Sequence, residues 1–149
     1  AQMIKTFRGR LTDDSQIKVR LSTKKGKMGY KIIKFEIMPQ LPHSVQQVDV
    51  VQVFKVDQSA NISGTVDFSD GNLLAAAIGY FGTHSDNNQT RITMFEQEIF
   101  NQDIFVTHVD VKSNQACNYY LELEVTSLTD NAAAVSTLRD IRLNPQVGA

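Results

Sequence analysis

The stretch "NYYLELEVTSL", residues 118–128, alternates apolar with polar side chains at every second position. Leu121, Leu123 and Val125 share one side of an extended chain, and the residues between them are charged or polar. Successive side chains of a β-strand point to opposite faces of its sheet, so this period of two predicts a strand with one buried face.

Other segments repeat this signal along the chain. Residues 15–21, "SQIKVRL", alternate in the same way, and residues 45–57, "VQQVDVVQVFKVD", are apolar on both sides, which is typical of a strand covered on both faces. "LLAAAIGYF", residues 73–81, contains helix-forming Leu and Ala, but its length and its flanking glycines favour a buried strand. Residues 15–21 and 30–39 are predicted to form a hairpin around the turn "STKKGKMG".

A repeated pattern, "FEQEIFNQDIF" at residues 95–105, places Phe95, Phe100 and Phe105 five positions apart. A shift of five residues reverses the facing side of a strand, so one straight strand cannot bury all three rings. We therefore predict a break near residues 100–102, with a strand on each side of it.

About nine strands separated by short turns, with no long helical pattern, indicate an all-β class. This count includes a short strand before the Asp70-Gly71 turn, and residues 129–145 are compatible with a further strand or a short helix. We predict one domain over residues 1–149, an antiparallel β-sandwich of jelly-roll-like build.

Chemical motifs are scarce. Cys117 is the single cysteine, the three histidines are dispersed, and no nucleotide-binding or nucleophile motif occurs, so we expect no enzyme, no cofactor and no metal. The alternative is a small β-sandwich hydrolase that would use Glu98 and Asp103 around His108. No apolar run approaches the roughly 20 residues that cross a bilayer, and we expect a soluble chain without a membrane partner.

Charge is divided unevenly along the chain. Residues 1–34 carry a net charge of +8 and the remainder a net charge of −9, which predicts two faces of opposite sign that could meet each other in an oligomer. Nucleic acid is a weaker expectation, because the basic residues are spread through alternating strands with few aromatic residues among them.

Five segments together carry a resemblance. They are "IKVRLSTKKGKMGYKIIKFEIMP", "TVDFSDGNLLAAAIGYF", "FEQEIFNQDIFVTHVD", "ACNYYLELEVTSL" and "LRDIRLNP". In this order the chain resembles small virion structural proteins of marine tailed bacteriophages. The resemblance implies a non-enzymatic component of the virion, assembled in the bacterial cytoplasm. It implies above all a decoration or cement protein that binds the major capsid protein and copies of itself, with a trimer as the first candidate oligomer.

The expected interface combines the basic residues of the first third of the chain. These are Arg8, Arg10, Arg20, Lys24, Lys25 and Lys27. The alternative within the virion is a tail, baseplate or host-attachment protein that binds a glycan or a receptor. That alternative predicts an exposed aromatic platform built from Tyr30, Tyr80 or Phe81.

Overall fold

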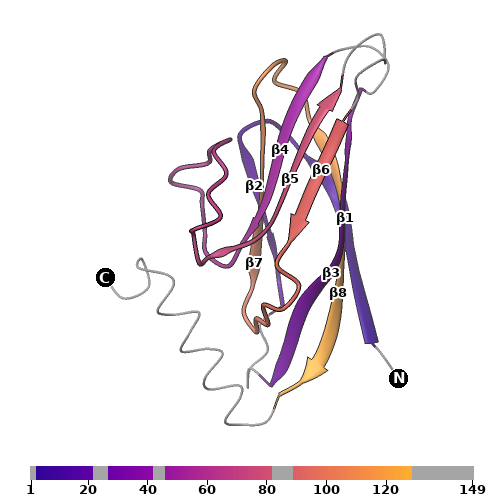
Figure 1. The fold of residues 1–149 in the computed structure, drawn as a ribbon, viewed down its shortest axis with the longest axis vertical. Helices are drawn as coiled ribbons and strands as arrows, with labels where there is room; N and C mark the ends of the chain where they lie inside the picture. The colour runs from indigo at the N-terminus through magenta and orange to yellow at the C-terminus, as the bar shows by residue number, and fades with distance from the viewer. Residues whose placement is uncertain (1–2, 22–26, 42–45, 82–88, 129–149) are drawn as a thin grey trace.

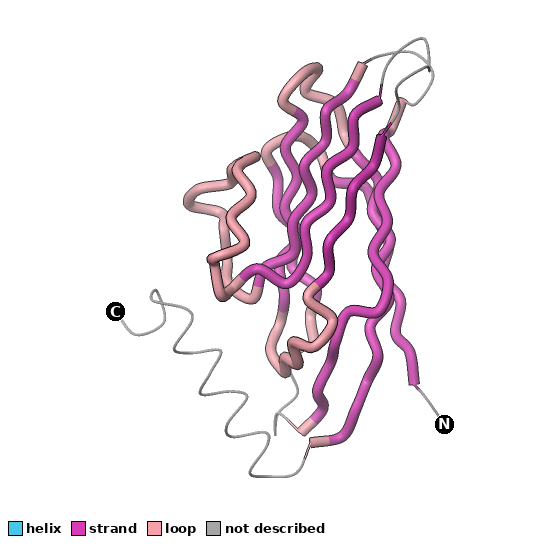
Figure 2. Tube along the Cα trace, in the orientation of Figure 1, coloured by secondary structure: helices cyan, strands magenta, loops and turns pink. Residues whose placement is uncertain are grey.

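The computed structural model describes residues 3–21, 27–41, 46–81 and 89–128, and these form eight strands joined by loops (Figures 1 and 2). The strands are β1 Met3–Leu11, β2 Ser15–Val19, β3 Met28–Pro39, β4 Gln47–Phe54, β5 Leu73–Phe81, β6 Gln89–Met94, β7 Ile104–Asp110 and β8 Cys117–Ser127. The predicted all-β class is confirmed. Among the described residues there is no helix of the length and apolar character that would cross a bilayer.

The strands form two antiparallel sheets that pack face to face as a β-sandwich. One sheet has the order β1-β8-β3 and the other the order β2-β7-β4-β5-β6. β1 pairs with β8, β2 with β7 and β4 with β5, as in an eight-stranded chain that is doubled on itself and then wrapped into two sheets. This nested pairing is the jelly-roll arrangement, and it confirms the predicted fold class.

β6 departs from the regular jelly roll. It forms a ladder with β5 at the edge of the five-stranded sheet, although it also lies in contact with β3 of the other sheet. The five-stranded sheet is therefore wider than its partner, and β6 lies between β5 and the strands of the smaller sheet in Figure 1.

The core lies between the two sheets. β8 is the central strand of the smaller sheet, and Leu121, Leu123 and Val125 all point into the core as their alternation predicts. β4 is central in the larger sheet and is buried on both faces over nearly its whole length, because the 18-residue connection 55–72 folds over its outer side (Figure 2). Residues 73–81 form a strand, as predicted.

Two local predictions are wrong. β2 and β3 do not form a hairpin, because they belong to different sheets. No strand forms at residues 65–68, where backbone and side-chain turns organise the connection instead. The possible element at residues 129–145 lies outside the described residues.

The predicted break near residues 100–102 is confirmed, and the segment without a strand is longer than expected. β6 ends at Met94 and β7 begins at Ile104. Phe100, between them, is buried, pairs with Tyr30 through two backbone hydrogen bonds of 2.8 and 2.9 Å, and stacks on its ring. The ring with the deepest burial thus belongs to the connection rather than to either strand.

Candidate functional site

Each of the three residues of the hydrolase hypothesis interacts with a residue outside that trio. Glu98 lies 3.4 Å from the Lys55 ammonium. Asp103 accepts the backbone N–H of Leu21 at 2.7 Å and also contacts Lys18. His108 pairs with neither of these carboxylates but with Asp49, a residue that the sequence did not single out as chemical.

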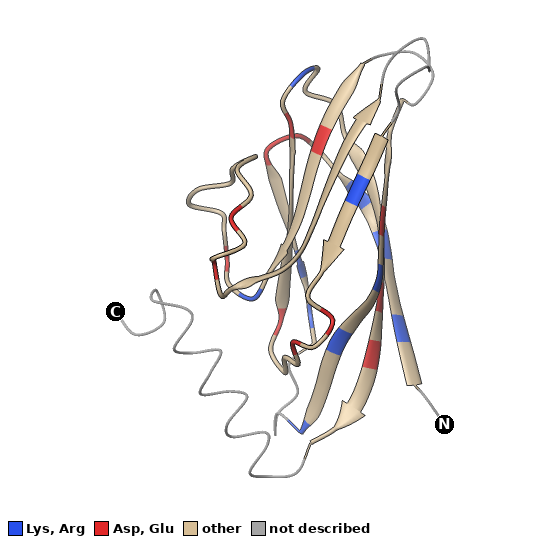
Figure 3. Ribbon diagram, viewed as in Figure 1, with Lys and Arg blue, Asp and Glu red and all other residues tan. Residues whose placement is uncertain are grey.

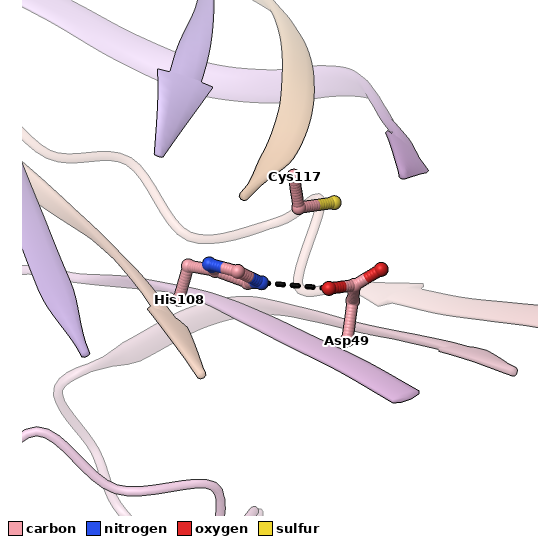
Figure 4. Close-up of side chains that lie close together, drawn as sticks. All are labelled: Asp49, His108 and Cys117. Atoms are coloured by element: carbon pink, nitrogen blue, oxygen red, sulfur yellow. Dashed lines mark hydrogen bonds and ion pairs between the residues drawn. The ribbon is translucent and has the colours of Figure 1, made fainter. Parts of the chain in front are cut away.

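Asp49 and His108 lie diagonally across neighbouring strands on the inner face of the larger sheet. In the β4–β7 ladder Asp49 is opposite Asp110 and Val51 is opposite His108, which brings alternate positions of the two strands within side-chain reach. Cys117 opens β8 in the other sheet and faces the same space (Figure 4). The Asp49 carboxylate, the His108 ring nitrogen and the Cys117 sulfur all lie within 4.8 Å of one another.

The hydrogen bonds of His108 show which of its ring nitrogens carry a proton. Nδ1 lies 3.0 Å from the backbone carbonyl of Thr12, which can only accept, so Nδ1 carries a proton. Nε2 lies 2.8 Å from Oδ1 of Asp49 and shares the second proton with it (Figure 4). Both ring nitrogens are therefore occupied, and neither offers a lone pair to a substrate or to Cys117.

Burial by itself lowers the pKa of His108, since neither it nor Asp49 is exposed. Hydrogen bonds to Asp49 and to the Thr12 carbonyl, together with the charges of Asp49 and Asp13, outweigh that effect and raise the pKa above its usual value of 6.5. The charged form, an imidazolium paired with a carboxylate, is the state that these contacts favour.

Gln47 completes the surroundings of Asp49. Its amide nitrogen is 3.2 Å from each oxygen of the carboxylate and 3.1 Å from the carbonyl of Ala116. Its amide oxygen accepts the backbone N–H of Leu41. The buried pair is thus linked by hydrogen bonds to β4, to the start of β8 and to the segment after β3, so it ties both sheets together.

Asp110 anchors the β7–β8 turn beside this network. Its carboxylate accepts backbone N–H groups from Val48, Lys112, Ser113 and Gln115 at 2.9 to 3.2 Å. Burial raises the pKa of Asp110, but these four donors outweigh it and bring the pKa below its usual value. The turn that leads to Cys117 is therefore held by one carboxylate.

Cys117 is a poor nucleophile in this position. Burial, and then the charge of Asp49, raise the pKa of its thiol far above the usual value. The protonated sulfur lies 3.5 Å from the carbonyl oxygens of Met38 and Asn118. Cysteine, histidine and aspartate are adjacent here, but the nucleophile is not ionised and the base is not free.

The same three residues carry a ligand set that zinc accepts. His108 even has the outer hydrogen bond to a carbonyl that orients many metal-bound histidines. A metal would nevertheless have to separate Nε2 from Asp49 and to ionise Cys117, because the present arrangement is a closed hydrogen-bond network. We therefore describe the cluster as a buried polar network, formed by Gln47, Asp49, His108, Asp110 and Cys117.

The predicted interface residues lie in several places. Arg8 and Arg10 are exposed on β1, Arg20 is exposed just after β2, and Lys27 is exposed just before β3. Lys24 and Lys25 lie outside the described residues. Of the three aromatic residues proposed as a glycan platform, Tyr30 is only 1% exposed, Phe81 is half-buried, and Tyr80 alone is well exposed.

The expectation of two oppositely charged faces is only partly met (Figure 3). Glu122 and Glu124 of β8 lie between the basic strands β1 and β3, and Lys31 pairs with Glu124 at 3.5 Å. Other acidic groups, including Asp49 and Asp110, are buried. The cationic excess therefore remains chiefly on β1, which has no acidic residue.

The sequence did carry one signal for the buried network. Asp49 is the one charged residue of a valine-rich strand that was expected to be covered on both sides, and a buried carboxylate requires a partner. The identity of that partner depends on the β4–β7 register, which the sequence does not reveal. No known family model matches the chain, and no curated protein is significantly similar to it.

Proposed function

We propose that this chain is a non-enzymatic structural protein of a tailed-phage virion. In this proposal it is a capsid decoration or cement protein that binds the major capsid lattice and further copies of itself. The observation that carries the proposal is the exposure of two edge strands, β1 over its first four residues and β6 over its first five, on both of their faces.

An antiparallel sheet in an isolated domain normally has one buried face. In β1, all four residues from Met3 to Thr6 are exposed, although alternate residues point to opposite sides. In β6, the first five residues are exposed in the same way. Met3, Ile4 and Ile92 are consequently apolar side chains in contact with water, at 56%, 44% and 37% exposure.

These edges also carry cations. Lys5, Arg8 and Arg10 lie on β1 and Arg91 lies on β6, and neither strand has an acidic residue (Figure 3). Positive charge on an edge strand opposes indiscriminate pairing with other strands. Apolar contact area surrounded by cations suits a partner that offers an acidic surface, and this combination supports the assembly proposal.

The buried network is consistent with a structural role. Its ionisable groups bond to one another and to the backbone, and they join strands of both sheets. A cement protein needs a rigid body of this kind rather than a reactive centre. The host-attachment alternative would instead use the polar loop on the outer side of the larger sheet.

The proposal is tested by co-sedimentation of the purified chain with empty shells of the major capsid protein of the same phage, at low and at high salt. We expect the chain in the shell pellet at low salt and its release as ionic strength rises. The double variant Arg8→Glu, Arg10→Glu should lose this binding. Lys112→Glu, which reverses an exposed cation in the β7–β8 turn, is the matched control and should retain it.

Light scattering on the same samples reports the native mass and therefore the oligomer number. A chain that stays in the supernatant at every salt concentration would refute the cement assignment. Equal loss of binding in the Lys112→Glu control would show that overall charge, rather than β1, governs the association.

A further inference from the structure

The connection between β4 and β5 is long for a loop in a compact domain. It spans 18 residues, 55–72, without a helix or strand, whereas loops longer than about 12–15 residues are uncommon and often functional. It folds back over the outer face of the larger sheet rather than extending into solvent (Figure 2). The loop therefore covers a surface of β4 and β7 that would otherwise be exposed.

Local turns give this loop its shape. The carboxylates of Asp57, Asp67 and Asp70 each accept the backbone N–H two residues further on, at 2.7 to 2.9 Å. Ser63 does the same for Thr65. These side-chain turns order the backbone without regular secondary structure.

Two side chains of the sheet hold the loop in place. Gln16 of β2 donates to the Asp57 carboxylate at 2.9 Å and accepts the backbone N–H of Gln58 at 2.6 Å. Gln52 of β4 points outward, is only 2% exposed, and donates its amide hydrogens to the carbonyls of Ser63 and Thr65 at 3.2 Å each. The distance between loop and sheet is thus set by a hydrogen-bonded bridge. Side chains do not fill all of the space beside that bridge.

A cavity of about 190 Å³ remains between the loop and the sheet. Its floor is made by Gln52, Phe54 and Thr107 on β4 and β7, and its loop side includes Asn61, Asp67 and Asp70. The hydroxyl of Thr107 makes no hydrogen bond within the described residues, although the residue is only 2% exposed. A polar group at the floor of a polar cavity is available to a ligand or to water.

The chemistry of the lining narrows the class of ligand. Amides, hydroxyls and carboxylates can donate to and accept from the hydroxyl groups of a sugar, and the Phe54 ring offers an apolar face to its C–H groups. No lysine, arginine or histidine lines the cavity within the described residues. The pKa of Asp67 is lowered by hydrogen bonds from the Ser69 side chain and backbone, so its carboxylate is ionised at neutral pH and repels anions.

We infer that this cavity, under the loop 55–72, is a binding site for one neutral sugar ring. The volume fits a ligand smaller than the drug-sized molecules that occupy about 300–1,000 Å³. The inference goes beyond the cement role and does not depend on it, because the site lies on the larger sheet and uses neither Arg8 nor Arg10.

The test uses amide NMR spectra of the ¹⁵N-labelled chain during titration with the methyl glycosides of glucose, galactose and mannose. We expect at least one of them to shift the backbone amides of Asn61, Ser63 and Thr65 and the side-chain amide of Gln52. Glucuronic acid, which differs from glucose by a carboxylate at one carbon, should leave these signals in place.

Thr107→Val removes only the free hydroxyl at the floor, with little change in shape. It should weaken binding by about fivefold, the effect of one net hydrogen bond. Thr93→Val is the matched control. Thr93 lies in the same cross-strand row, on the exposed side of β6, and outside the cavity, so its loss should not change the affinity.

Three results would overturn the inference: no neutral glycoside shifts these amides, Thr107→Val binds as tightly as the unmodified chain, or calcium chloride alone reproduces the shifts. Near-identical amide spectra of the two valine variants outside the substituted positions would show that both remain folded.

Discussion

Truncation of Asp49 to alanine tests the buried network most directly. In the structure the carboxylate of Asp49 is fully buried and lies 2.8 Å from Nε2 of His108. It also accepts both amide contacts from Gln47 at 3.2 Å. Asp49→Ala would leave the imidazole without its counterion and the Gln47 amide with the Ala116 carbonyl alone. Removal of one partner of a buried pair costs about 3–5 kcal/mol, so we expect a loss of that size in the free energy of unfolding.

Asp49→Asn removes the charge of the carboxylate but can keep its hydrogen bonds. The asparagine oxygen can accept from Gln47 while its amide group donates to Nε2 of a neutral His108, whose Nδ1 still donates to Thr12. Every polar group then keeps a partner. We expect a cost of about 1 kcal/mol, well below that of the alanine variant.

Urea unfolding of the two variants, followed by circular dichroism, measures these differences. Glu36→Ala is the control, because the Lys34–Glu36 pair is exposed at 49% and 57% and should contribute no more than about 1 kcal/mol. If Asp49→Ala lost less than Glu36→Ala, the network would not be the stabilising element that we describe.

The pH dependence gives an independent check. The pKa of His108 is raised by folding, so the folded chain binds its proton more tightly than the unfolded chain does. The resulting stabilisation is complete below the unfolded value of 6.5 and is lost as pH rises through the folded pKa. Asp49→Asn should abolish this decline above pH 6.5, and an unchanged decline would assign it to another group.

Two further outcomes follow from the same network. Cys117 should not react with a thiol reagent at neutral pH in the folded chain and should react fully in urea, because burial and Asp49 keep the thiol protonated; rapid labelling without urea would contradict this. Asp110→Asn should lower the free energy of unfolding by about 1–3 kcal/mol, because an asparagine amide cannot accept all four backbone N–H groups. The unmodified chain loses stability as pH falls from 3.8 through the lowered pKa of Asp110, and the variant should not show this loss. Urea unfolding at several acidic pH values measures it.

The sequence was sufficient to predict a strand and its buried face where the residues of that strand alternate between apolar and polar. Leu121, Leu123 and Val125 alternate with polar residues, and the alternation gave both the strand and its buried face. The break before Ile104 followed from the five-residue spacing of three phenylalanines. These predictions depend only on the two-residue period of a strand, which is a local property of the backbone.

The hairpin prediction failed because proximity in sequence was taken as proximity in a sheet. The sequence between β2 and β3 contains glycines and lysines that suit a hairpin, yet the structure places these two strands in different sheets. The short strand before Asp70 failed for a related reason. The Asp67 carboxylate accepts a backbone N–H within the loop, and the backbone carbonyl of Thr65 accepts from Gln52, so neither group joins a ladder.

The sequence by itself determined the all-β class and the positions of most strands. Only the tertiary structure decided that Asp49 pairs with His108, that Cys117 lies beside them without being activated, and that a polar cavity lies under residues 55–72. The physical reason is that side-chain period is local, whereas these contacts join residues far apart in the chain. Their identity depends on strand order and register, which the packing of the whole sandwich sets.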